Sequence, residues 1–131
     1  MTNLIIVGHG GYGTAIKNVL NMLMGDLDEN VLFIDFNPED DINSLNAKIE
    51  SAVEKCKEDI LFACDIAGGS PFKQCAALCI GTHGRIAVAG LNVIAYAEMA
   101  NNLDMTADVL LELALEAVKI GVVYFPKKSN E

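Results

Sequence analysis

The chain has 131 residues and a mass of 14.0 kDa, the size of one ordinary domain with a buried core. Its 18 acidic residues outnumber nine Lys and Arg, and the net charge of −9 excludes nucleic acid and anionic lipid as principal ligands. Hydrophobic residues make up 52% of the chain, yet no apolar run approaches the roughly 18–20 residues of a membrane span. The first apolar run, residues 4–7, is too short for a signal peptide. We therefore expect a cytoplasmic protein that forms one domain over residues 1–131.

The residues predict strands and helices in alternation. Short apolar runs closed by Gly, Asp or Asn predict buried strands over 4–7, 31–36, 60–64 and 85–89. Apolar residues spaced three to four apart predict helices over 14–24 and 41–56, with further helices expected over 92–101 and 106–120. Ser70 is the expected N-cap, and Pro71 the expected first residue, of another helix that runs to about residue 80. Residues 122–125 are a last short β-prone run.

This order predicts an α/β fold with an open, mostly parallel sheet of four strands and helices on both faces. In the strand order 2-1-3-4, ligands bind beyond the carboxyl ends of the first and third strands, where the order reverses. The first strand leads into His9 and the third into Asp65. The pattern therefore predicts one histidine and one carboxylate in the same crevice.

His9 is the strongest candidate for chemistry. Gly8 and Gly10 leave its ring accessible and allow backbone N–H groups, that of Gly10 among them, to approach a bound anion. An imidazole is largely neutral and nucleophilic at the pH of a cell. Asp65 could accept a hydrogen bond from one ring nitrogen and present the other as nucleophile. A loop histidine without chemistry, and an aspartate that merely caps the next loop, are the alternatives.

The segment Gly68–Ser70 is the second candidate element. Two glycines lead into a helix whose free N–H groups and dipole would face the crevice and favour an anion, although an ordinary strand-to-helix turn has the same pattern. The glycines of 8–13 lack dinucleotide-binding spacing, and Cys75 and Cys79 lack two further metal ligands nearby. We expect neither an organic cofactor nor a metal. His83 is expected in a solvated loop at the opposite end of the sheet.

Four stretches carry a resemblance to a known family. They are LIIVGHG (4–10), FIDF (33–36), CDIAGGSPF (64–72) and AGLN (89–92). In this order they resemble the IIA component of the mannose-type sugar phosphotransferase system, over nearly the whole chain. One departure is Ala67, where members of the family often carry Trp.

The resemblance implies a phosphocarrier. His9 would accept a phosphoryl group from phospho-HPr, Asp65 would orient its ring, and Gly68, Gly69 and Ser70 would lie near the phosphoryl group. The group would pass to a IIB protein, and the membrane components IIC and IID would then phosphorylate sugar during uptake. Family members are homodimers that often exchange a C-terminal strand, for which the candidates are Val122, Val123, Tyr124 and Phe125. Three other hypotheses remain: a subunit that serves dihydroxyacetone kinase, a regulatory anion-binding module, and a small hydrolase.

Overall fold

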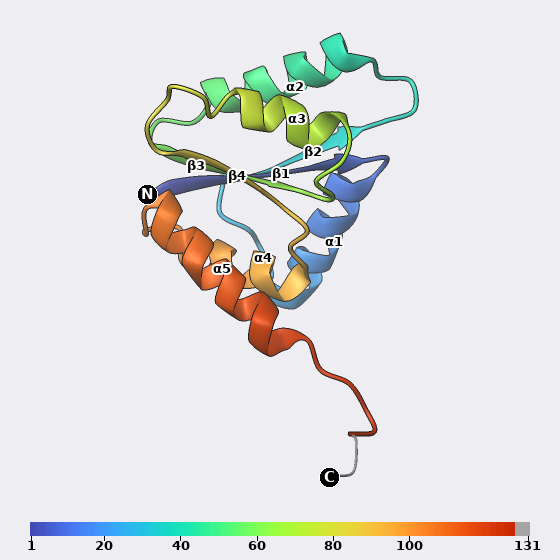
Figure 1. The fold of residues 1–131 in the computed structure, drawn as a ribbon, viewed down its shortest axis with the longest axis vertical. Coiled ribbons are helices and arrows are strands. Elements are labelled where there is room, and N and C mark those ends of the chain that lie inside the picture. The colour runs from blue at the N-terminus through green and yellow to red at the C-terminus, as the bar shows by residue number, and fades with distance from the viewer. Residues whose placement is uncertain (128–131) are drawn as a thin grey trace.

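The computed structural model describes residues 1–127, and its centre is one sheet of four parallel strands (Figure 1). The order is β2-β1-β3-β4, as the alternation of strands and helices predicted. β1 and β3 are the two inner strands, so Leu4 lies opposite Val31 on one side and Leu61 on the other. The strands are β1 (Thr2–His9), β2 (Val31–Phe36), β3 (Asp59–Cys64) and β4 (Arg85–Ala89).

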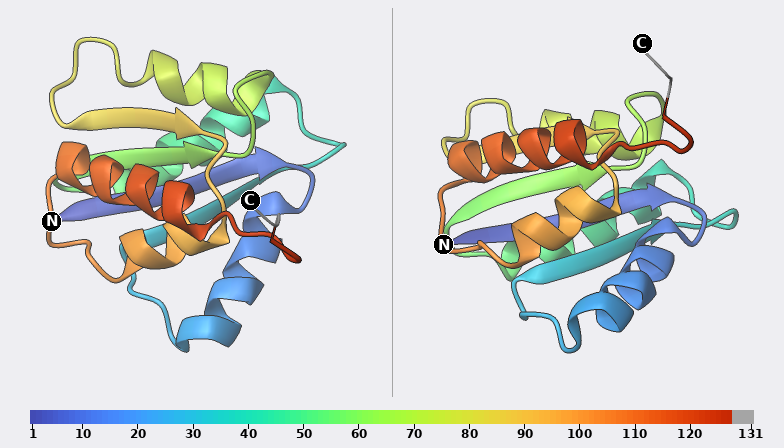
Figure 2. Two further views of the ribbon diagram at one scale, coloured as in Figure 1. Left: turned by 60° about the horizontal axis from the view of Figure 1, so that its bottom comes forward. Right: turned by 90° about the horizontal axis from the view of Figure 1, so that it is seen from below.

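Helices cover both faces of this sheet, which confirms the predicted layers. One face carries α2 (Ile42–Glu54) and α3 (Ser70–Ala77), drawn above the sheet in Figure 1. The other face carries α1 (Tyr12–Met24), α4 (Val93–Ala100) and α5 (Ala107–Gly121), and Figure 2 shows α4 and α5 lying across it. Crossover helices of this kind bury both faces of a parallel sheet, which is why its inner strands read as continuous apolar runs.

Two cores result, and the alternation of β1 side chains divides them. Leu4 and Ile6 are fully buried on the side of α1, α4 and α5. Ile5 and Val7 are fully buried on the side of α2 and α3. Because side chains alternate along a strand, His9 continues the row of Ile5 and Val7 and points toward the face of α2 and α3. The burial pattern of β1 thus determines that the His9 side chain lies on the face of α2 and α3.

The start of α3 differs from the prediction. The helix begins at Ser70 itself, its N-cap is Gly69, and no side chain caps it. Gly69 has φ +102° and ψ 179°, a conformation open essentially to glycine alone. Ser70 is therefore the first helical residue, not the cap. The helix also ends at Ala77 and is followed by turns, short of the predicted end near residue 80.

The segment after α5 forms no strand in this single chain. Residues 122–127 extend away from the body of the protein (Figure 1). The side chains of Val122, Val123, Tyr124 and Phe125 are 70%, 81%, 64% and 94% exposed. A strand needs a hydrogen-bonding neighbour, and the chain's own sheet supplies none here. Separately, no helix within residues 1–127 is long and apolar enough to cross a bilayer.

Candidate functional site

The structure places His9 and Asp65 in contact at the carboxyl edge of the sheet. His9 is the last residue of β1, and Asp65 follows the last residue of the neighbouring strand β3. Asp65 Oδ2 accepts a hydrogen bond from the His9 backbone N–H at 2.9 Å and lies 2.8 Å from His9 Nδ1. Parallel strands bring their carboxyl ends to one edge, which is why the strand order alone could predict this meeting.

The electrostatics of this pair select one ring nitrogen. The Asp65 side chain is 13% exposed, and this burial opposes its ionisation. Hydrogen bonds from the His9 N–H, from the His9 ring and from the Ile66 N–H outweigh burial and hold the pKa of Asp65 below its usual value. A carboxylate only accepts, so Nδ1 of the neutral imidazole carries the hydrogen that it donates to Asp65. Nε2 then keeps its lone pair, and the His9 side chain is 42% exposed to a partner.

Gly69 lies directly against this free nitrogen. A Cβ added at Gly69 would come within 2.9 Å of both His9 Cε1 and Nε2. At Gly68, by contrast, an added Cβ would meet nothing within 4 Å. Ser70 opens α3, whose first-turn N–H groups have no acceptor within the helix and whose dipole favours an anion. The loop thus places the start of α3 beside His9 Nε2, and no side chain of Gly69 lies between them.

Gly10 has a different place from the one predicted. Its backbone N–H donates to the Phe36 carbonyl at 2.7 Å. Its φ of +58° turns the chain sharply after His9, a conformation that favours glycine. The N–H group that was expected to approach an anion is therefore engaged inside the protein. Gly10 shapes the loop, and the amides of Gly68–Ser70 remain for a ligand.

Two residues at the end of β2 escaped the sequence reasoning. The Phe36 ring lies beside the His9 ring, with centroids 5.9 Å apart. Asp35 accepts hydrogen bonds from the Thr14 N–H at 2.9 Å and from the Thr14 hydroxyl at 2.5 Å. It therefore caps the start of α1. The signal for Phe36 is the register of β1 and β2, in which it stands directly opposite His9.

Two neighbouring tyrosines, Tyr12 and Tyr96, stay protonated and are hydrogen-bonded to each other. The Tyr12 ring occupies the space that a side chain at Gly8 would need. Its hydroxyl is hydrogen-bonded to that of Tyr96, which is fully buried. Burial raises the pKa of both hydroxyls above the usual value, so both stay neutral at physiological pH. His9 and Asp65 are left as the candidate pair.

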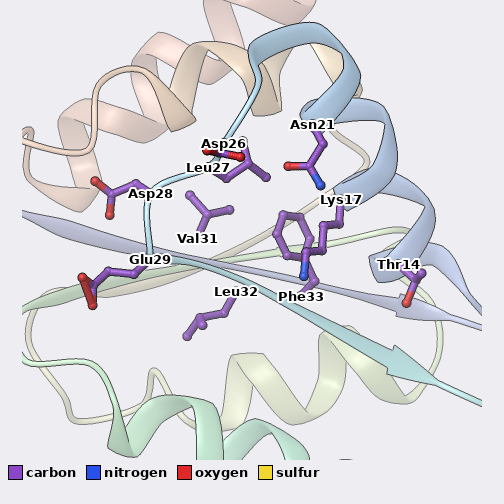
Figure 3. A pocket seen from close by; sticks show the side chains of 10 residues that line it. All are labelled: Thr14, Lys17, Asn21, Asp26, Leu27, Asp28, Glu29, Val31, Leu32 and Phe33. Atoms are coloured by element: carbon purple, nitrogen blue, oxygen red, sulfur yellow. The ribbon is translucent and has the colours of Figure 1, made fainter.

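One hollow of the described surface lies away from this pair. It measures about 700 Å³ and is bounded by α1, the turn after it and the start of β2 (Figure 3). Lys17 faces it together with acidic Asp26, Asp28 and Glu29, and no residue of the candidate site lines it. His83 is exposed before β4, at the amino end of the sheet, as predicted. Residues 1–127 contain no group of three or more His, Cys, Asp or Glu placed to hold a metal.

Comparisons with known proteins place this chain in a family. A family model described as "PTS system fructose IIA component" matches residues 3–114. The chain is 32% identical over 136 residues to the PTS system mannose-specific EIIAB component of Escherichia coli (strain K12), covering 100% of this chain and 42% of that protein. It thus spans less than half the length of that relative.

Two further relatives are of similar length to the chain. The PTS system sorbose-specific EIIA component of Lacticaseibacillus casei is 33% identical over 100 residues, covering 76% of this chain and 72% of that protein. The crystal structure of phosphotransferase system component EIIA from Streptococcus agalactiae superposes with a TM-score of 0.85 at 29% identity, covering 95% and 98% of the two chains. The chain belongs to the IIA-component family of the sugar phosphotransferase system.

Proposed function

We propose that this chain carries a phosphoryl group on His9 Nε2, taking it from phospho-HPr and passing it to a IIB protein during sugar uptake. One observation carries the proposal. Asp65 holds His9 Nδ1 at 2.8 Å, so the second ring nitrogen is free and turned toward the glycine loop that starts α3. The 131 residues act here as a single IIA-type domain in the cytoplasm, and the IIB partner links it to the membrane components IIC and IID.

The transfer step follows from this geometry. The Nε2 lone pair attacks phosphorus in line, the new N–P bond forms, and the donor's P–N bond breaks with its electron pair left on the donor imidazole. Asp65 keeps the Nδ1 proton in place and stabilises the positive charge that grows on the ring. The amides of the Gly68–Ser70 segment bind the phosphoryl oxygens. Transfer onward is the same step in reverse, with the IIB side chain as nucleophile, so no metal or organic cofactor enters.

The open position of His9 suits transfer between proteins. Its side chain is 42% exposed on the carboxyl edge of the sheet rather than enclosed in a cavity. A partner can therefore bring its own phosphorylated or accepting side chain into line with Nε2. The net charge of −9 steers a basic partner surface toward the chain. The names of the relatives and this exposure favour a sugar phosphocarrier over a dihydroxyacetone kinase subunit or a regulatory anion-binding module.

Mapping the phosphoryl group tests the proposal. The chain is incubated with phosphoenolpyruvate, enzyme I and HPr, and the phosphohistidine is located by mass spectrometry and its ring nitrogen by ³¹P NMR. We expect one phosphoryl group per chain, on His9 Nε2, and loss of the label on adding a IIB protein. His83 is the internal control, because it is exposed at the other end of the sheet. Label on His83, or none at all, would contradict the proposal, and label that no IIB removes would favour the regulatory module.

We further propose that the chain is a homodimer through Val122, Val123, Tyr124 and Phe125. These four apolar side chains are exposed in the single chain, and β2 and β4 each leave one edge of the sheet unpaired. A partner's sheet edge would pair the backbone of this segment and cover its side chains. Exposed apolar surface of this extent indicates an interaction site.

Light scattering after gel filtration tests the dimer. The wild-type chain is expected at twice its mass of 14.0 kDa, and Phe125→Asp at the mass of one chain. Ile80→Asp is the matched control, since Ile80 is also apolar and 81% exposed but lies in the turn after α3. It should remain dimeric. A wild-type monomer at micromolar concentration would contradict the dimer. Equal dissociation of both variants would contradict the assignment of residues 122–125 as its interface.

A further inference from the structure

The end of β2 brackets the candidate histidine from the side opposite Asp65. β1 lies between β2 and β3, and Phe36 stands directly opposite His9 in the parallel pairing of β1 with β2. Paired residues of parallel strands present their side chains to the same face, so both rings turn toward α2 and α3. The centroids of the two rings are 5.9 Å apart and the ring planes are tilted by 57°. This distance lies within the range of favourable aromatic contacts.

Phe36 also fixes the chain just after His9. Its carbonyl oxygen accepts the Gly10 N–H at 2.7 Å, which forms an isolated antiparallel bridge beyond the end of the ladder. Its ring is half-buried and packs against the core under α2 and α3. The ring is therefore anchored by the core and is a fixed wall for its exposed neighbour.

The imidazole is thereby limited on three sides. Asp65 holds Nδ1, Gly69 lies against Cε1 and Nε2, and Phe36 stands beside the ring. A hydrogen bond at Nδ1 alone fixes one atom and leaves the ring free to tilt about that bond. An anchored aromatic ring removes part of this freedom. Nε2 must point along the line of attack for phosphoryl transfer, and a misplacement of about 1 Å can cost roughly 10²-fold in rate.

We propose that Phe36 is a positioning residue for phosphoryl transfer, which holds the His9 ring so that Nε2 faces the incoming phosphorus. This inference rests on the proposed function of His9. Phe36 meets His9 ring to ring and has no polar side-chain atom, so it acts through the orientation of His9. It therefore changes the rate of the transfer step and leaves the affinity for the partner protein nearly unchanged.

Rapid-quench transfer from phospho-HPr tests this inference, with the rate measured over a range of donor concentrations. For Phe36→Ala we expect a maximal rate about 10–100-fold lower, with the half-saturating donor concentration within about twofold of wild type. Phe36→Leu keeps apolar bulk and is expected to recover part of the rate. Long-range ¹H–¹⁵N NMR of His9 should show a single Nδ1–H tautomer in wild type and an averaged ring in Phe36→Ala.

Phe33→Ala is the matched control. Phe33 is the same residue type on the same strand and is likewise half-buried, but it pairs with Ile6 and packs on the opposite face. It should lower stability without changing the maximal rate. Equal rates for wild type, Phe36→Ala and Phe33→Ala would overturn the inference, as would a change confined to the half-saturating concentration. Absence of label from the wild-type chain would instead overturn the function of His9, and the NMR tautomers would still report whether Phe36 orders the ring.

Discussion

Replacing Asp65 with asparagine is expected to slow phosphoryl transfer to His9 by about 10²–10⁴-fold. The carboxylate accepts from the His9 N–H, from His9 Nδ1 and from the Ile66 N–H. The asparagine amide has only one oxygen that can accept from these donors. Its NH₂ group would face a remaining N–H donor, with which it cannot form a hydrogen bond. The neutral side chain also no longer stabilises the cation that forms when Nε2 gains the phosphoryl group. Single-turnover labelling with excess phospho-HPr measures the loss directly.

Asp35→Asn is the matched control for this substitution. Asp35 is the same residue type, is also half-buried and lies near the carboxyl end of β2, on the far side of β1 from β3. Its carboxylate, however, accepts hydrogen bonds from Thr14 at the start of α1. A hydrogen bond to a charged group typically contributes about 1.5–3 kcal/mol, and a neutral amide weakens the two that Asp35 accepts from Thr14. Asp35→Asn should therefore unfold at lower urea concentration and still accept phosphoryl groups at nearly the wild-type rate. If Asp65→Asn is labelled as fast as Asp35→Asn, Asp65 has no part in the transfer.

The same carboxylate makes stability depend on pH in a defined direction. The pKa of Asp65 is lowered in the folded protein from its usual value of 3.8, so folding favours the charged form. Its contribution to the free energy of unfolding is fully present above pH 3.8 and is lost as pH falls through the lower pKa of the folded state. The stability difference between wild type and Asp65→Asn should therefore be constant near neutral pH and shrink in acid below this value.

Much of this site could be predicted because it depends on strand order. Buried parallel strands are continuous apolar runs, so β1 and β3 were visible in the sequence, and neighbouring parallel strands end at one edge. His9 and Asp65 had to meet once the order 2-1-3-4 was assumed. Phe36 and Asp35 could not be placed in this way, because strand order leaves the register open. A shift of β2 by one residue would turn Phe36 away from His9.

The remaining differences between prediction and structure arise where the local sequence pattern does not determine the backbone geometry. Ser70 followed by Pro71 has the composition of a helix cap, but the conformation of Gly69 starts the helix one residue early. The Gly10 N–H looked available and is taken by Phe36. Residues 122–125 have the composition of a strand, yet the single chain offers them no hydrogen-bonding neighbour. Composition indicates what a segment can form, and its neighbours decide whether it does.

Gly69→Ala is the second substitution with a large expected effect. The backbone conformation of Gly69, φ +102° and ψ 179°, is strained for any residue with a Cβ, at a cost of about 1–3 kcal/mol. Lower chain entropy in the unfolded state offsets about 0.4–1 kcal/mol of this cost. The new methyl group would also lie 2.9 Å from His9 Cε1 and Nε2, so the ring must turn away from its bond to Asp65 or the loop must shift.

Both responses harm the transfer step. A turned ring loses the tautomer that Asp65 selects, and a shifted loop moves the start of α3 away from Nε2. We expect labelling by phospho-HPr to slow by on the order of 10²-fold, together with a lower urea midpoint. Gly68→Ala separates these effects from a general loss of loop flexibility, because its methyl group would meet nothing within 4 Å and its φ is not positive. It should be up to about 0.4–1 kcal/mol more stable than wild type, because the unfolded chain loses entropy, and its backbone N–H is kept, so its rate should match wild type. Wild-type labelling by Gly69→Ala would show that the space beside Nε2 is not where the phosphoryl group arrives.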